Sequence, residues 1–126
     1  MSLFVTLLGL WSATDWYVFQ MDRCNDTVVV HGLWPQWGEW CAGAPFDPAA
    51  LAPIAARLEK DWPSCVGPHP NATAFHAHEW LKHGACTPYT ELEYFSHTLA
   101  LYDTYKATGH TRVCLNHGLL PIHCPT

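Results

Sequence analysis

The stretch from residue 75 to residue 86 reads Phe-His-Ala-His-Glu-Trp-Leu-Lys-His-Gly-Ala-Cys and gathers side chains that could do chemistry. Four ionisable groups lie close together in it: His78, Glu79, Lys82 and His83. At about 100° per residue these four would share one face of a helix, with Trp80 and Leu81 on the opposite face. We therefore expect a helix over 72–83 that packs its apolar side on a core and exposes two imidazoles, a carboxylate and an ammonium.

This combination of groups suits acid–base chemistry on a phosphodiester. Imidazole titrates near neutrality and can give or take a proton, and an ammonium can stabilise charge on phosphate oxygens. The alternative for this segment alone is a solvated helix face with ordinary ion pairs. A zinc-protease site is disfavoured because its two histidines must be four residues apart, whereas His78 and His83 are separated by one residue more. We expect neither a metal nor a cofactor.

A second stretch, 28–37, reads Val-Val-Val-His-Gly-Leu-Trp-Pro-Gln-Trp. Its run of β-branched residues predicts a buried strand over 27–31 that presents His31 at its end. Residues 16–21, rich in aromatic and β-branched side chains, predict the preceding strand, and Asn25-Asp26 predicts the turn between the two. An imidazole is thus expected where the second strand of this unit ends.

The other segments divide into helices over 48–61 and 91–106, loops over 36–48 and 63–70, and irregular structure over 112–126. Asp47 followed by Pro48 is typical of a helix start, although Pro53 confines the regular part of that helix to the residues after this proline. Thr90-Glu91-Leu92-Glu93 fits a capping box and indicates where the last helix begins. No repeat or low-complexity segment is present in the sequence.

The chain has 126 residues, which predicts one domain with a modest core. Its formal net charge of −5 with neutral histidines has the wrong sign for a general nucleic-acid binder. Protonation of all nine histidines would bring that charge to about +4, since histidine titrates near pH ~6.5. The composition therefore excludes attraction to RNA at neutral pH and allows it in an acidic compartment.

The six cysteines indicate a disulfide framework and an oxidising compartment. Residue spacing alone leaves 15 possible connectivities. Two sequons, which begin at Asn25 and Asn71, predict glycosylation and agree with passage through the secretory pathway. A cysteine–histidine metal cluster is disfavoured because the sequence has no Cys-x-x-Cys pair.

The first thirteen residues are mostly apolar and allow two interpretations. They resemble the apolar part of a signal peptide that ends near Ser12-Ala13, or they form a strand or helix retained in the fold. They are too short to span a bilayer as a helix, so no stable membrane span is expected. The predicted organisation is this segment, 1–13, followed by a single domain over 14–126.

Two motifs together resemble the active-site signatures of the ribonuclease T2 family. His-Gly-Leu-Trp-Pro at 31–35 matches the first signature without a change, and His-Glu-Trp-x-Lys-His-Gly-x-Cys at 78–86 matches the second. The resemblance covers roughly 14–121 and implies an α+β fold, a central antiparallel sheet with packed helices. Family domains are usually considerably longer, so the resemblance implies a truncated or divergent C-terminal part.

The resemblance also implies a role for each charged residue of the two motifs. RNA carries its own nucleophile, the 2′-hydroxyl, so the enzyme needs a base, an acid and positive charge at the phosphate. His83 would be the base, and His31 would protonate the leaving 5′-oxygen. Glu79 and Lys82 would stabilise the transition state, Glu79 would also orient and charge-balance the imidazoles, and His78 would bind phosphate. Glu79 and a bound phosphate should together raise the histidine pKa values. The first product would be a 2′,3′-cyclic phosphate, which water then opens.

Aromatic residues beside the motifs have expected roles as well. Trp34 matches a family position whose indole stacks on a base, and the alternative is a core tryptophan. Stacking tolerates any base, and Gln36 stands where many members carry an acidic residue, so only weak base preference is expected. His76 replaces the usual tryptophan, which would remove aromatic surface beside the site or add a cation to it in acid.

The family resemblance pairs Cys41 with Cys86 and Cys24 with Cys65, which leaves Cys114 with Cys124. The first of these bonds would tie the loop after His31 to the end of the catalytic helix.

Two classes of function follow from the sequence. The first is an acid endoribonuclease of low base specificity that acts on single-stranded RNA in an extracellular, lysosomal or vacuolar compartment. The second is a non-catalytic binding or structural subunit of a larger assembly, for which the sequence indicates no protein partner. The complete set of five ionisable residues favours the first: His31, His78, Glu79, Lys82 and His83.

Overall fold

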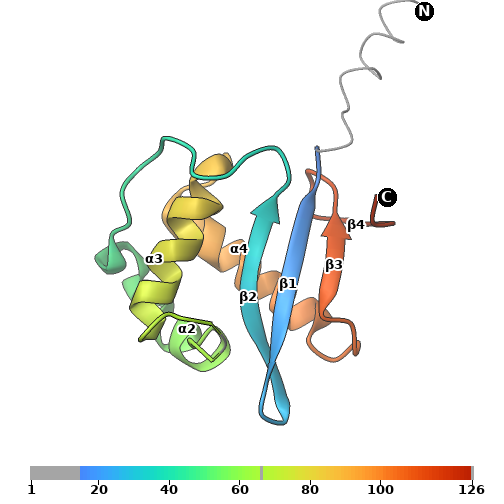
Figure 1. Cartoon of the computed structure of the whole chain (residues 1–126), viewed down its shortest axis with the longest axis horizontal. Coiled ribbons are helices and arrows are strands. Elements are labelled where there is room, and N and C mark those ends of the chain that lie inside the picture. The colour runs from blue at the N-terminus through green and yellow to red at the C-terminus, as the bar shows by residue number, and fades with distance from the viewer. Residues whose placement is uncertain (1–14, 66, 126) are drawn as a thin grey trace, which may run out of the picture.

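The computed structural model describes residues 15–65 and 67–125. The segment 1–13 with its two interpretations lies outside this part of the chain. A sheet of four strands forms one layer, in the order β2 (Thr27–Pro35), β1 (Tyr17–Cys24), β3 (Arg112–Leu115) and β4 (Pro121–Ile122). Every neighbouring pair is antiparallel, and the helices lie behind the sheet and beside its β2 edge (Figure 1). The expected α+β fold with a central antiparallel sheet is confirmed.

The β1–β2 hairpin turns at Asn25-Asp26 as the sequence predicts, with Asn25 in the left-handed region at φ 59°. The second strand does not end at His31 but continues to Pro35. It can continue because the ladder shifts register there: Met21 pairs with Val30, whereas Gln20 pairs with Gly32. His31 is thus the extra residue of a β-bulge, a device that redirects side chains.

The helical elements are η1 (Pro48–Ile54), α2 (Ala55–Asp61), α3 (Ala72–Lys82), η2 (Gly84–Cys86) and α4 (Glu91–Tyr105). As expected, Asp47 caps the first of them, and its regular α-helical part begins only after Pro53. The side chain of Asn71 accepts a hydrogen bond from the amide of Ala74 at the start of α3. Thr90 and Glu93 form the predicted capping box of α4.

The core lies between α4 and one face of the sheet. Phe19 and Leu33 from the sheet and Phe95 from α4 have no exposed surface. Two tyrosines of α4 also bind the edge of β2, because the hydroxyl of Tyr94 donates to the carbonyl of Leu33 at 2.7 Å and that of Tyr102 to Val28 at 2.7 Å. These contacts fix β2, the strand that carries His31, to the core.

The prediction of irregular structure over 112–126 is wrong for the strands β3 and β4. Arg112–Leu115 pairs with β1, and its Cys114 and Leu115 are buried. A strand this short has no readable hydrophobic period, and its pairing depends on a partner nearly one hundred residues earlier in the chain. In the described part of the chain, no helix combines the length and apolar character needed to cross a membrane.

Three disulfides join the cysteines in the pairing that the family resemblance implies: Cys24–Cys65, Cys41–Cys86 and Cys114–Cys124. Cys41–Cys86 connects the loop after β2 to η2, directly beyond α3. Backbone and side-chain bonds reinforce this connection. The amide of Trp40 donates to the carbonyl of Lys82 at 2.8 Å, and the indole of Trp37 donates to the carbonyl of Cys86 at 2.9 Å.

We predict that Cys41→Ser/Cys86→Ser lowers the free energy of unfolding by about 2–4 kcal/mol, because the bond closes a long loop. The sequence separation is 45 for this pair and 10 for Cys114–Cys124. The double variant Cys114→Ser/Cys124→Ser is therefore a matched control with a smaller expected loss. Urea denaturation of both variants measures the difference. Equal losses in the two would contradict the prediction.

Candidate active site

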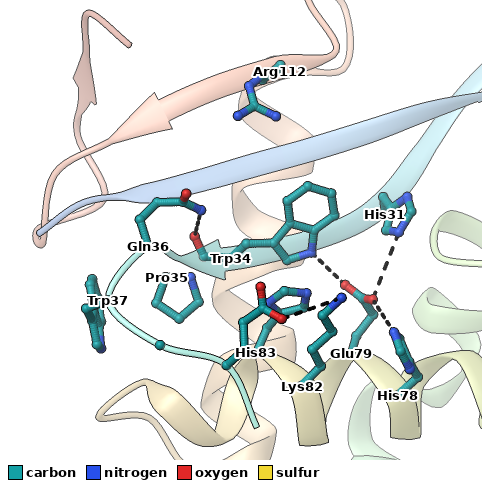
Figure 2. A pocket seen from close by; sticks show the side chains of 12 residues that line it. His31, Trp34, Pro35, Gln36, Trp37, His78, Glu79, Lys82, His83 and Arg112 are labelled. Carbon is teal, nitrogen blue, oxygen red and sulfur yellow. Dashed lines mark hydrogen bonds and ion pairs between the residues drawn. The ribbon is translucent and has the colours of Figure 1, made fainter. Parts of the chain in front are cut away.

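A cleft of about 640 Å³ opens between the end of β2, the loop after this strand and α3. Its lining includes the six residues to which the sequence analysis gives catalytic, phosphate-binding or base-binding roles: His31, Trp34, His78, Glu79, Lys82 and His83. Figure 2 shows them around the carboxyl group of Glu79, with Arg112 of β3 above the indole of Trp34. The structure thus brings residues of the two motifs to one site.

The β-bulge brings Trp34 to the same face of β2 as His31. Residues three apart on a regular strand lie on opposite faces, yet the rings of His31 and Trp34 are in contact, with centroids 5.0 Å apart. The extra residue in β2 puts both on the side that faces the cleft. Sequence reasoning placed His31 correctly at the site but could not find the bulge.

His31 also has a partner that the sequence did not indicate. Its Nδ1 lies 2.6 Å from Oδ2 of Asp22, on the neighbouring strand β1. The ring is packed edge-on against Trp34 and also against Phe75 of α3, at 5.3 Å. No local motif marks Asp22, because its role depends entirely on strand pairing.

Glu79 is the most buried charged residue of the cleft, with 1% of its surface exposed. The sequence predicted it on an exposed helix face, and that prediction is wrong. Its Oε1 accepts a hydrogen bond from the indole Nε1 of Trp34 at 2.8 Å, which satisfies this oxygen without water. Leu81, expected on the packed side of α3, is 41% exposed instead.

Gly32 makes the burial of Glu79 possible. A Cβ at this position would lie 2.0 Å from Oε1 of Glu79 and 2.4 Å from Nε1 of Trp34. Only glycine therefore leaves room for the hydrogen bond between the two side chains. The second oxygen of Glu79, Oε2, faces His31 Nε2 at 4.0 Å and His78 Nε2 at 3.9 Å (Figure 2).

Burial raises the pKa of Glu79 to about 7, although the bond from Trp34 and the charge of Lys82 act in the opposite direction. Desolvation by the surrounding protein is the largest cause, because it penalises the carboxylate more than the neutral acid. Below neutral pH this carboxyl group therefore holds a proton and can donate a hydrogen bond into the cleft.

His83 lies just beyond α3, which ends at Lys82 rather than at His83 as predicted. It has non-helical backbone angles, is 7% exposed and stacks on the indole of Trp34, with centroids 5.3 Å apart. Its Nδ1 is buried and has no hydrogen-bond partner in the described part of the chain. Burial first, and then the charges of Lys82, His78 and His31, lower the pKa of His83 to about 3.

The sequence predicts that Glu79 and a bound phosphate together raise the histidine pKa values, but with Glu79 alone the pKa values of His83 and His78 are lowered. Burial and the neighbouring cations also lower the pKa of His78, whose ring lies 4.6 Å from that of His69. Glu79 cannot offset these effects while it is itself protonated. Lys82, the remaining charge of the site, lies 3.6 Å from the exposed carboxylate of Glu39.

His76 is not beside the cleft, which corrects the expectation from the sequence. Its ring is buried and lies 2.7 Å from the carbonyl of Trp62, where it packs edge-on against the indole of that residue. Burial lowers its pKa, so it adds no cation to the site. Among the residues that the structure describes, no group of three or more histidine, cysteine or acidic side chains is arranged to hold a metal ion.

We predict that the stability of the chain falls between about pH 4.5 and pH 7 because of Glu79. The native state keeps the proton of this carboxyl up to about pH 7, whereas the unfolded chain releases it near the ordinary value of 4.5. Ionisation therefore costs the native state up to about 3 kcal/mol. Glu79→Gln cannot ionise and should lose this component of the pH dependence.

Chemical denaturation at several pH values measures the effect, and Glu59→Gln is a control because Glu59 lies on the exposed surface of α2. A constant difference in unfolding free energy between Glu79→Gln and the unsubstituted chain across this pH range would contradict the prediction.

Comparison with known proteins agrees with the geometry. The model of the ribonuclease T2 family matches residues 6–121. Ribonuclease DdI of Dictyostelium discoideum is 31% identical over 79% of this chain and 48% of its own length. Human ribonuclease T2 is 32% identical over 88% of this chain and 45% of its own length. The chain thus spans about half the length of these curated relatives.

Among solved structures, the RNase-related protein from Calystegia sepium superposes with a TM-score of 0.74 over 92% of this chain and 93% of its own. Its sequence is 20% identical, so this likeness concerns the fold alone. The family assignment comes from the sequence match over most of the chain and agrees with the two motifs that meet in the cleft. The chain belongs to the ribonuclease T2 family.

Proposed function

We propose that this chain is a metal-independent endoribonuclease that cleaves single-stranded RNA by transphosphorylation through a 2′,3′-cyclic phosphate. One observation carries the proposal. Two imidazoles from different elements, His31 of β2 and His83 beyond α3, both contact the ring of Trp34 in one cleft, at 5.0 and 5.3 Å. A base and an acid that act on the same phosphodiester need this proximity.

His83 is the general base of the proposed reaction. With its pKa lowered to about 3, the imidazole is neutral at any pH above this value and can accept the proton of the 2′-hydroxyl. A bound phosphate offsets the neighbouring cations and so strengthens this base when substrate is present. His31 is the general acid, which donates its proton to the leaving 5′-oxygen.

Glu79 and Lys82 stabilise the charge that develops on the phosphate oxygens. With a pKa near 7, Glu79 is neutral in acid and can donate a hydrogen bond from Oε2, while Oε1 stays bound to Trp34. Lys82 supplies positive charge and exchanges its partner Glu39 for phosphate. His78, whose Nε2 faces the same oxygen of Glu79, binds a phosphate oxygen.

Trp34 stacks on a base with the indole face that His83 does not cover. Stacking without a specific hydrogen bond predicts low base specificity. Gln36 lines the same cleft, but its amide donates to the backbone carbonyl of Trp34 at 3.0 Å. This hydrogen bond uses one donor of the Gln36 amide to stabilise the loop, so that donor is not available to a base.

The proposed location is the secretory pathway, with an extracellular, lysosomal or vacuolar destination. Three disulfides agree with an oxidising compartment. Asn25 at the hairpin turn and Asn71 at the start of α3 are exposed, which a glycan requires. The helix cap uses only Oδ1 of Asn71, whereas a glycan would attach to Nδ2.

The first test of this function is the loss of cleavage in His31→Ala and His83→Ala. Each substitution removes a group that transfers a proton, so we expect each rate to fall by roughly 10²–10⁴-fold. His110→Ala is the matched control, because His110 is exposed and does not line the cleft. The assay measures acid-soluble nucleotides from RNA in the presence of EDTA, with circular dichroism to check the fold.

Near-unsubstituted rates in either variant would contradict the assignment of that residue. RNA that is bound but not cleaved by the unsubstituted chain would favour the alternative, a non-catalytic binding subunit. Activity that EDTA removes would contradict a metal-independent reaction.

The second test is the pH dependence of kcat/KM at fixed ionic strength. Protonation of His83 should remove activity near pH 3, and ionisation of Glu79 near pH 7 should place a negative charge beside the phosphate. We therefore expect a bell-shaped profile with its maximum near pH 5. A flat profile, or an optimum above pH 8, would contradict this mechanism.

A further inference from the structure

We propose that Asp22 is a positioning residue for His31: its carboxylate accepts a hydrogen bond from Nδ1–H and so makes Nε2 the nitrogen that exchanges protons with RNA. The inference rests on the proposed function and adds to it a residue outside both sequence motifs. It also explains why the neutral His31 is ready to act again in the second step of the reaction.

The contact between the two side chains is short and well placed. Oδ2 of Asp22 lies 2.6 Å from Nδ1 of His31, and the two side chains are 20% and 29% exposed. Partial burial weakens the competition of water for this hydrogen bond. The ring is also packed edge-on against Trp34 and Phe75, so it cannot easily rotate to present Nδ1 to the cleft.

The strand register explains how Asp22 reaches the imidazole. Asp22 pairs with Val29, so their side chains share one face of the sheet, and His31, two residues after Val29, lies on that same face by the ordinary alternation of a strand. The bulge changes the face only of the residues that follow His31. It thereby brings Trp34 to the face that carries Asp22 and His31, so that the imidazole contacts both the carboxylate and the indole.

Two carboxyl groups face opposite nitrogens of this ring. Asp22 lies at 2.6 Å from Nδ1, whereas Oε2 of Glu79 lies at 4.0 Å from Nε2. In the tautomer with its proton on Nε2, the ring could donate toward Glu79, but it would have no lone pair directed into the cleft. The shorter bond to Asp22 favours the tautomer with its proton on Nδ1, and Glu79 competes weakly because it is itself protonated in acid.

The proton balance of the reaction shows why the tautomer matters. When protonated His31 acts as the acid, the Nε2–H bond breaks, an O–H bond forms on the leaving oxygen, and the electron pair stays on Nε2. The other proton stays on Nδ1, which donates a hydrogen bond to the carboxylate of Asp22. His31 is then neutral with a free Nε2 lone pair, which can take a proton from the water that opens the cyclic phosphate.

The first experiment reads the tautomer directly by ¹⁵N NMR of the imidazoles in the full chain. We expect neutral His31 to carry its proton on Nδ1, and Asp22→Ala to shift it toward a mixture of tautomers. Asp26→Ala is the control, because Asp26 is exposed at the hairpin turn. Neutral His31 with its proton on Nε2 in the unsubstituted chain would overturn the proposal without any variant.

The second experiment measures RNA cleavage by the same proteins. We expect Asp22→Ala to lower kcat by roughly 10–100-fold, part of the contribution of a general acid, with KM nearly unchanged. Asp22→Glu should restore most of the rate, since it returns a carboxylate to the strand. Equal kcat values for Asp22→Ala and the unsubstituted chain would overturn the proposal while leaving the proposed function intact.

If the unsubstituted chain cleaves no RNA, the proposed function is wrong. The NMR experiment then decides the role of Asp22 by itself: a proton on Nδ1 of neutral His31 supports this role, and a proton on Nε2 overturns it.

Discussion

The hydrogen bond from the Trp34 indole to Glu79 is the interaction on which the cleft depends. It joins β2 to α3 at 2.8 Å and satisfies one oxygen of a carboxyl group that has 1% of its surface exposed. A buried carboxyl without such a partner would cost several kcal/mol. The absence of a side chain at Gly32 leaves the space for this bond. The other oxygen of Glu79 is thereby directed at His31 and His78.

Burial in this cleft reverses the usual order of two titrations. A glutamate normally releases its proton before a histidine does, yet here the pKa of Glu79 is about 7 and that of His83 about 3. The cause is the same for both groups, because a poorly hydrated site penalises whichever form is charged. Between these two values the carboxyl is an acid and the imidazole is a base, the states that the proposed reaction requires.

The sequence predicted the site well where its features are local. Both motifs and the capping box of α4 agree with the structure. The three disulfide pairs also agree, but two of them join distant segments and were implied by the family resemblance and not by the residue pattern. The sequence failed where a feature depends on pairing between distant segments. The bulge at His31, the approach of Asp22 and the strand β3 are properties of the ladder. The burial of Glu79 was missed because periodicity does not reveal that an indole N–H is positioned to bind a charged side chain.

The charge of the chain in acid is also distributed differently from what its composition suggests. With all nine histidines protonated the net charge would rise from −5 to about +4. At pH 5 His83 stays neutral, which makes the net charge one unit lower than if every histidine were protonated. Glu79 takes up a proton at this pH, which raises the net charge by one unit and compensates for His83. The consequence is local. In the proposed reaction, a phosphate that enters the cleft therefore meets no carboxylate from Glu79, and the ammonium of Lys82 supplies an attraction that the protein as a whole lacks at neutral pH.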